Sequence, residues 1–212
     1  LDLRCLGGQE LAWSRLRGSA RGRADLVGTG RPQADQPRRR PELQFAPCHR
    51  AAHRHRRALF RVHPEPGRYN FVASDQYVAF GEKHNMHIIA HALVWFHQTP
   101  DWVFQDEAGN PLSRKALLKR MKDHIFTVMG RYKGRIHGWD VVNEAIMKDG
   151  SFRQCKWLEI IGEDYVQKAF EFAREADPDA ELYYNEYDYE FGPKTEGVIE
   201  LVKNLQNNGV QV

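Results

Sequence analysis

From residue 63 onward, short apolar runs rich in β-branched residues alternate with longer amphipathic stretches. Continuous or alternating apolar runs predict strands, and apolar positions three and four apart predict helices. We expect strands over residues 87–95, 136–142 and 182–187, and the start of a fourth at residue 210. The first run is nearly all apolar, which is typical of a buried parallel strand. Strands that alternate with helices in this way predict parallel βα units.

The predicted helices each have an apolar stripe and a signal at one or both ends. Ser74 is expected to cap the first helix, and Ser113 and Gly134 to bound the second. A third is expected over residues 163–176, and a fourth ends at Gly209. Their apolar positions are Tyr77, Val78, Phe80 and Met86; Leu117, Leu118, Met121, Ile125, Val128, Met129 and Tyr132, which share one face; Val166, Ala169, Phe170 and Ala173, which are expected to face inward; and Val198, Ile199, Val202 and Leu205.

This order of elements indicates an α/β protein with a parallel sheet. Both a doubly wound open sheet and a (β/α)8 barrel fit the connection lengths, and periodicity does not distinguish them. No Gly-rich phosphate-binding turn follows any predicted strand. The nucleotide-binding version of the open sheet is therefore the weaker alternative.

Composition divides the chain into two parts. Residues 1–60 contain 13 arginines and no lysine, isoleucine, tyrosine, methionine or asparagine. Such a segment resembles GC-rich DNA translated in the wrong frame, so we interpret residues 1–60 as an unassigned, non-native or disordered Arg-rich segment. The alternative is a basic arm that binds nucleic acid through the arginine runs at 38–40 and 54–57. We expect no nucleic-acid partner, because no folded nucleic-acid module follows.

Several other kinds of site and partner have no sequence signal. Cys5, Cys48 and Cys155 show no metal-ligand spacing, and their odd number gives no disulfide framework. We therefore expect neither a metal nor another cofactor. There is no apolar run of about 18 residues and no visible signal-peptide core, so no membrane partner is expected. The oligomeric state is left open by the sequence.

Polar and aromatic side chains gather where the predicted strands end. The first strand carries His91 and Trp95, with Gln98 just beyond it. Polar and aromatic residues also occupy positions 139–144 and 185–188, at the ends of the next two strands. In both architectures, functional groups lie at the carboxyl ends of parallel strands. Carboxylates, amides, imidazole and indole faces are the groups that an oligosaccharide cleft needs.

Glu144 is the strongest single candidate from the residues alone. It directly follows an apolar strand and has Asn143 as its neighbour. Partial desolvation favours the protonated form of a carboxyl group, which suits proton donation. A purely structural role for Glu144 is equally open at this point: it would pair with an arginine or cap the next segment. His91 and Trp95, taken alone, fit core positions on an apolar strand better than ligand contacts.

Four motifs, in order and in register, carry a family resemblance. Residues 63–71 read His-Pro-Glu-Pro-Gly-Arg-Tyr-Asn-Phe, and residues 91–100 read His-Ala-Leu-Val-Trp-Phe-His-Gln-Thr-Pro. Residues 139–145 read Trp-Asp-Val-Val-Asn-Glu-Ala, and residues 184–188 read Tyr-Asn-Glu-Tyr-Asp. Together they closely resemble the signatures of glycoside hydrolase family 10, a family of endo-1,4-β-xylanases.

The resemblance implies that residues 61–212 are part of a (β/α)8 TIM-barrel catalytic domain. It implies hydrolysis of internal β-1,4 bonds of xylan with retention, by an enzyme that is secreted or periplasmic. Glu144 takes the role of general acid/base, and xylan or xylo-oligosaccharide is the partner. The residues implied to bind substrate are Asn143 at the sugar 2-hydroxyl, His91, Trp95 and Gln98 on the glycone side, and Tyr187 on the aglycone side.

Three departures from the family pattern limit this expectation. The family places Glu-Asn-x-x-Lys before residue 63, where this chain has Arg54, His55 and Ala58. The nucleophilic glutamate is expected on a later strand, beyond Val212, so this fragment is expected to have no turnover. Phe96 stands where the family usually has a second histidine.

The alternatives to a xylanase fragment are a non-catalytic carbohydrate-binding half-barrel or a nucleic-acid-binding protein that uses its basic arm.

Overall fold

The computed structural model describes residues 62–212. The interpretation of residues 1–60, with its arginine runs and two cysteines, and the comparison at Arg54, His55 and Ala58 lie outside the described residues. Within them, three strands form one parallel sheet in the order β1, β2, β3. The elements along the chain are α2 (Val72–Lys83), β1 (Ile89–Trp95), the 3-10 helix η2 (Asp101–Val103), α3 (Arg114–Tyr132), β2 (Gly138–Asn143), α4 (Lys156–Ile161), α5 (Tyr165–Ala176), β3 (Glu181–Asn185) and α6 (Pro193–Asn207).

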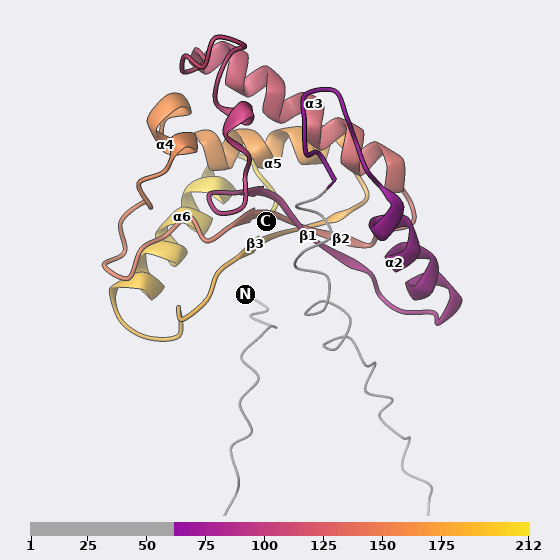
Figure 1. Ribbon diagram of the computed structural model, residues 1–212. Helices are drawn as coiled ribbons and strands as arrows, with labels where there is room; N and C mark the ends of the chain where they lie inside the picture. The colour runs from indigo at the N-terminus through magenta and orange to yellow at the C-terminus, as the bar shows by residue number, and fades with distance from the viewer. Residues whose placement is uncertain (1–61) are drawn as a thin grey trace, which may run out of the picture. The chain divides into compact units, whose positions relative to one another are not determined.

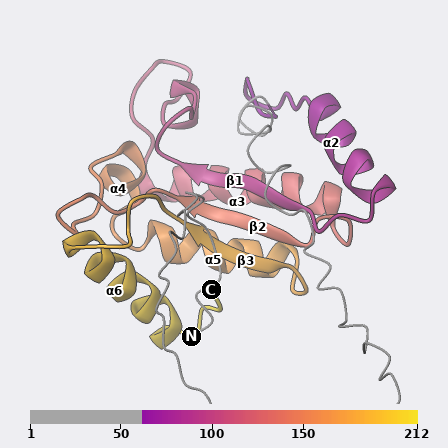
Figure 2. The same cartoon turned by 90° about the horizontal axis from the view of Figure 1, so that it is seen from below.

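Helices α3 and α5 pack against each other and cover one face of the sheet (Figure 1). Seen from below, the strands run side by side in front of these two helices, with α2 on the side of β1 and α6 on the side of β3 (Figure 2). The core lies between the layers and includes Trp139 and Val141 of β2, Ile125 of α3 and Phe170 of α5, each at most 1% exposed. The core that supports the strand ends is thus formed by the apolar side of the sheet and the predicted apolar faces of α3 and α5.

The strand register aligns the polar strand ends. Trp95 lies beside Asn143, and Asn143 beside Asn185; earlier on the strands, His91 lies beside Asp140. Because all three strands are parallel, their carboxyl ends lie at one edge of the sheet. The polar residues predicted to act together therefore lie at the same edge of the sheet.

The two helices on the sheet agree best with the sequence pattern. The side chain of Ser113 accepts a hydrogen bond from the Ala116 N–H, as expected of a helix cap. Helix α5 begins two positions later than predicted and buries its expected face. The residues of the predicted apolar faces that are buried in these helices are Leu117, Met121, Ile125, Val128, Met129, Tyr132, Val166, Ala169, Phe170 and Ala173.

The cap predicted for the first helix was wrong, and two apolar side chains of the predicted helices lie at the surface. Ser74 lies inside α2 and is buried, and Phe71 occupies the cap position without a side-chain hydrogen bond. Phe80 is 54% exposed, and Ile199 is 47% exposed. In α6 the buried stripe passes through Leu201 and Leu205, spaced four apart, and a helical turn of 100° per residue directs Ile199 away from it.

Two further differences concern element boundaries. Helix α4 lies between the strand predicted over 136–142 and the helix predicted over 163–176, where no element was expected, and Trp157 and Ile161 anchor it in the core. The fourth strand expected from residue 210 is not formed, although Val210 is buried. A strand is defined by its ladder hydrogen bonds, and no described segment pairs with residues 210–212.

The loop after β2 approaches α6 so closely that only glycine fits. A Cβ atom built on Gly197 would lie 2.8 Å from the Gly150 Cα and closer still to the Gly150 carbonyl oxygen. We expect Gly197→Ala to lower the free energy of unfolding by about 1–3 kcal/mol, because one backbone must move away from the other. Urea unfolding checks this, with Gly130→Ala in α3 as the matched helical control, since a Cβ there meets nothing within 4 Å. Equal stability of the two variants would contradict the prediction.

Candidate active site

His91 and Asp140 form a pair across β1 and β2 at the base of the strand ends. His91 Nδ1 lies 2.7 Å from Asp140 Oδ2, and their side chains are only 14% and 16% exposed. A carboxylate only accepts, so the ring donates from Nδ1, and this hydrogen bond fixes the orientation of the imidazole. His91 is therefore a partly buried, hydrogen-bonded side chain whose ring is held in one orientation.

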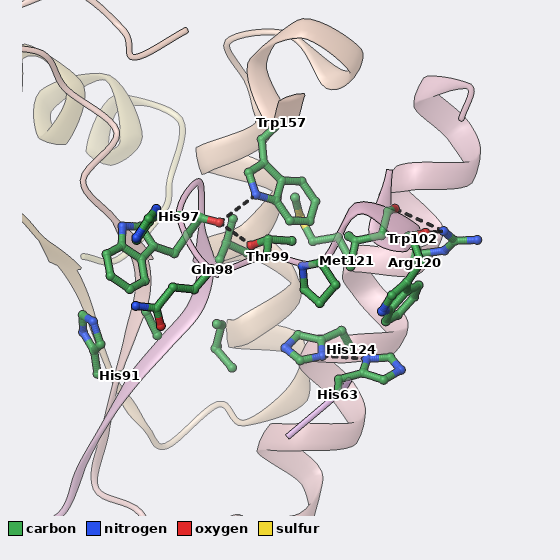
Figure 3. A pocket seen from close by; sticks show the side chains of 16 residues that line it. His63, His91, His97, Gln98, Thr99, Trp102, Arg120, Met121, His124 and Trp157 are labelled. Atoms are coloured by element: carbon green, nitrogen blue, oxygen red, sulfur yellow. Dashed lines mark hydrogen bonds between the residues drawn. The ribbon is translucent and has the colours of Figure 1, made fainter. Parts of the chain in front are cut away.

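The segment after β1 shapes a pocket that contains three of the predicted residues. His91, Trp95 and Gln98 line it, together with Trp157 of α4 (Figure 3). The Trp95 carbonyl accepts two hydrogen bonds, from Trp157 Nε1 at 3.1 Å and from Thr99 Oγ1 at 2.5 Å. The backbone of Gln98 has a φ of 61°, a left-handed conformation that turns the chain after Trp95. Asn143, Glu144 and Tyr187 do not line this pocket.

Three of the residues predicted to bind substrate each have a buried polar atom without a hydrogen-bond partner in the described residues. Trp95 Nε1, Gln98 Oε1 and Asn143 Nδ2 have no hydrogen-bond partner among residues 62–212. The other side of the Asn143 amide is engaged, because Asn185 Nδ2 donates to Asn143 Oδ1 at 2.7 Å. Buried polar atoms are nearly always paired, so three open ones at adjacent strand ends are typical of a site that binds a polar ligand.

Glu144 lies immediately beyond β2 with a φ of 58°. Its N–H donates to the Asn185 carbonyl at 2.9 Å, and its carbonyl accepts from Arg153 Nε at 2.8 Å. The backbone is thus held on both sides, while the carboxylate has no hydrogen-bond or ion-pair partner in the described part of the chain. Of the structural alternatives, the described residues show neither an arginine paired with the Glu144 carboxylate nor a cap made by it; Arg153 Nε binds the carbonyl oxygen instead.

Tyr187 and Glu186 follow β3 and have different environments. Tyr187 is 42% exposed, with the Lys194 ammonium nitrogen 3.8 Å from its ring centre. The Glu186 side chain is 1% exposed and lies 2.9 Å from Lys194 Nζ. Burial and the neighbouring Glu186 raise the pKa of Tyr184 well above its ordinary value, so its hydroxyl remains a donor to that carboxylate. Glu186 is fully engaged and is not available as a second reacting carboxylate.

Phe96, the departure from the family pattern, contacts the loop that follows Glu144. The Arg153 guanidinium lies 4.3 Å from the Phe96 ring centre, within cation–π range. Arg153 therefore connects the end of β1 with the Glu144 carbonyl. The aromatic ring at position 96 stacks on a residue that orients the Glu144 backbone.

Three further residues shape this region without having been predicted individually as site residues: Arg153, Asp140 and Lys194. For Asp140 a signal existed, since a charged residue interrupts an otherwise apolar strand. Arg153 and Lys194 look like ordinary surface cations in the sequence, and only their tertiary contacts distinguish them. In residues 62–212 no three His, Cys, Asp or Glu side chains are grouped as metal ligands, and no helix there is long and apolar enough to span a membrane.

At the far end of the same pocket, two histidines meet (Figure 3). His63 Nδ1 and His124 Nδ1 are 3.2 Å apart. Burial first, and then the charge that His63 would carry, lower the pKa of His124 from 6.5 to about 4. Burial and Arg120 lower the pKa of His63 as well. Both rings are therefore neutral in the folded state at neutral pH.

These lowered pKa values predict acid sensitivity. The unfolded chain binds protons on these histidines near pH 6.5 and the folded chain does not, so stability falls as pH drops from about 6.5 toward 4. We expect the free energy of unfolding to decrease over this window, measured by urea unfolding at successive pH values. In His124→Phe, which keeps a ring in the stack, this part of the dependence should disappear. An identical pH profile in both proteins would contradict the assignment.

Comparison with known proteins places this geometry in a family. The model of glycosyl hydrolase family 10 matches residues 58–212. Endo-1,4-beta-xylanase A of Xylanibacter ruminicola is 47% identical over 151 residues, which cover 71% of this chain and 41% of that protein. Endo-1,4-beta-xylanase B of Paenibacillus barcinonensis is 46% identical over 153 residues, which cover 71% of this chain and 46% of that protein.

Solved structures agree with the sequence comparison. A GH10 endoxylanase from a sugarcane soil metagenome superposes with a TM-score of 0.70 at 46% identity, over 71% of this chain and 44% of that one. The chain therefore spans less than half of the length of these relatives. The described α/β units are part of a (β/α)8 TIM barrel, which confirms the predicted fold class. On this match, covering most of the chain, the protein belongs to glycosyl hydrolase family 10.

Proposed function

We propose that the protein is an endo-1,4-β-xylanase and that residues 62–212 contribute the acid/base part of its active site. The observation that carries this proposal is the row of open polar atoms on Trp95, Gln98 and Asn143, adjacent to the unpaired carboxylate of Glu144 in sequence and strand register. Sugar hydroxyls both donate and accept, so they match an indole N–H, an amide N–H and an amide oxygen. Relatives of this chain at 46–47% identity are named endo-1,4-beta-xylanases, and one solved relative, xylanase 10B of Thermotoga petrophila, is in complex with xylobiose.

In the proposed mechanism Glu144 acts in two steps. As a carboxylic acid it protonates the leaving glycosidic oxygen, and as a carboxylate it then deprotonates the water that releases the sugar with retention. A free carboxylate on a backbone held by Asn185 and Arg153 suits both steps, because no ion pair locks its charge state. Asn143 Nδ2 would donate to the 2-hydroxyl, while His91, Trp95 and Gln98 would hold the glycone sugars and Tyr187 the aglycone sugar.

A retaining mechanism also needs a second carboxylate at about 5–5.5 Å from the first. Glu186 cannot serve, since its oxygens are bound by Lys194, Tyr184 and backbone amides. We propose that the nucleophile comes from a later strand of the barrel. The chain of 212 residues by itself is then expected to bind xylo-oligosaccharide without hydrolysing it.

Two measurements test the proposal. Isothermal titration of the chain with xylotetraose should show binding, with weaker binding of cellotetraose. A chimera in which residues 62–212 replace the matching segment of the Paenibacillus barcinonensis xylanase should release reducing sugar from xylan, with the β-anomer formed first by NMR. Binding by the chain without turnover by the chimera would favour a non-catalytic carbohydrate-binding function instead, and absence of both would overturn the proposal.

The cellular location is also a proposal, because it rests on family resemblance. We propose secretion or a periplasmic location, since xylan is a polymer outside the cell. The related TsXylA of Thermoanaerobacterium saccharolyticum is an intracellular xylanase, so relatives differ in this respect. Cell fractionation of the source organism, with detection by an antibody against residues 62–212, would separate the two locations.

A further inference from the structure

An ion pair is buried behind the end of β3. Glu186 Oε1 and Lys194 Nζ are 2.9 Å apart, and the two side chains are 1% and 2% exposed. Removing two charges from water costs so much that a hydrophobic pair of similar size is often at least as stable. Stability alone therefore does not account for this pair, and its other contacts point to a different role.

The Glu186 carboxylate reaches back to the segment that follows Glu144. Oε2 accepts from the Ile146 N–H at 3.2 Å and from the Tyr184 hydroxyl at 2.6 Å. The same hydroxyl accepts from the Ala145 N–H at 2.9 Å. Two consecutive amides after Glu144 are thus bound, one directly and one through Tyr184, to a single buried carboxylate.

These contacts bear on the direction of the Glu144 side chain. L-residues seldom adopt the left-handed conformation seen at Glu144, and they keep it only where their surroundings require it. The amides of Ala145 and Ile146 lie directly after this turn. Hydrogen bonds to both amides therefore fix the direction in which the chain leaves β2. An altered exit path would rotate the Glu144 carboxylate relative to Asn143.

Lys194 extends the network to the other side of the proposed cleavage point. Its ammonium group lies over the Tyr187 ring at 3.8 Å, and the Tyr187 N–H donates to Glu186 Oε1 at 3.1 Å. The proposed acid/base and the proposed aglycone contact are therefore attached to one ion pair.

We propose that Glu186, paired with Lys194 and hydrogen-bonded to Tyr184, is a positioning residue that fixes the backbone turn of Glu144 and the ring of Tyr187 for sugar binding. The part of this inference that concerns sugar rests on the proposed function. The part that concerns the backbone stands by itself. The network does no proton transfer; it acts through the two residues that it holds.

The test compares Glu186→Gln and Tyr184→Phe in the 212-residue chain with two matched controls. Glu175→Gln alters an exposed glutamate bound to Lys122, and Tyr183→Phe removes a hydroxyl from the neighbouring residue of the same strand, where it donates to Glu181. Amide hydrogen exchange is followed by NMR at Ala145 and Ile146, with Val141 as the core reference. Xylotetraose affinity is measured in the same samples.

In both network variants we expect exchange at Ala145 and Ile146 to accelerate at least about tenfold, with exchange at Val141 changed less than about twofold and the controls unchanged. A purely structural role would accelerate all three amides together, which would overturn the proposal. Tyr184→Phe keeps both charges, so it decides the question if Glu186→Gln does not fold. If wild-type chain does not bind xylotetraose, the proposed function fails while the exchange comparison still decides the role of Glu186.

Discussion

Replacing Glu144 by glutamine in the chimeric barrel is expected to lower the rate of xylan hydrolysis by about 10²–10⁴-fold, the usual contribution of a general acid/base. Glutamine has the same size and cannot donate a proton to the glycosidic oxygen or accept one from water. The Glu144 backbone is held by Asn185 and Arg153, so the substitution should leave the fold in place. Reducing-sugar release and the melting temperature, measured together, check both statements.

The leaving group gives a sharper version of this experiment. An aryl xyloside with a good leaving group needs little help from an acid. In Glu144→Gln, the rate of its glycosylation step should therefore fall far less than the rate for xylan. Azide, which needs no general base, should then restore turnover of the aryl substrate in Glu144→Gln. Glu175→Gln, an exposed glutamate in α5, is the matched control and should keep full activity. Equal losses on both substrates, without rescue by azide, would assign Glu144 a role other than acid/base.

The elements that the sequence predicts best are those whose burial follows directly from periodicity. Helices α3 and α5 lie on the sheet, so their apolar stripes are the faces that become buried. The three strands were predicted as parallel strands, with ends that differ from the observed ones by at most two residues. Their ends are set by the ladder to the neighbouring strand, and that information is not in a single segment.

The elements that the sequence misses depend on tertiary contacts. Helix α4 is only six residues long, too short for a periodic signal, and its place is fixed by Trp157 against Phe104. Ser74 matched the type of residue found at caps, but the chain enters the helix earlier, at Val72. In α6 the apolar residues outnumber those that the core accommodates, so pattern alone could not exclude Ile199.

The candidate site follows the same division. The strand ends are predictable, because parallel topology alone brings Trp95, Asn143 and Asn185 side by side. The roles of the individual side chains came from motif resemblance and stay predictions. The contacts that hold Glu144 could not be predicted, since Arg153 and Lys194 bind groups that the sequence does not mark: a carbonyl oxygen and a buried carboxylate.

Lys194→Met is expected to lower the free energy of unfolding by about 3–5 kcal/mol, the usual cost of removing one partner from a buried ion pair. The Glu186 carboxylate, whose side chain is 1% exposed, would remain in the interior with neutral donors only. Methionine fills much of the space of the lysine stem, so the loss comes from the uncompensated charge and not from a cavity. Urea unfolding at neutral pH measures it.

Two companions separate charge from packing. Lys122→Met removes the lysine from an exposed pair with Glu175 at a similar distance of 2.8 Å, and we expect it to cost less than about 1 kcal/mol. The double variant Lys194→Met with Glu186→Gln removes both charges, so it should recover a large part of the loss caused by Lys194→Met alone. A double variant as unstable as the sum of the two single variants would show that Lys194 stabilises the fold through packing and not through its charge.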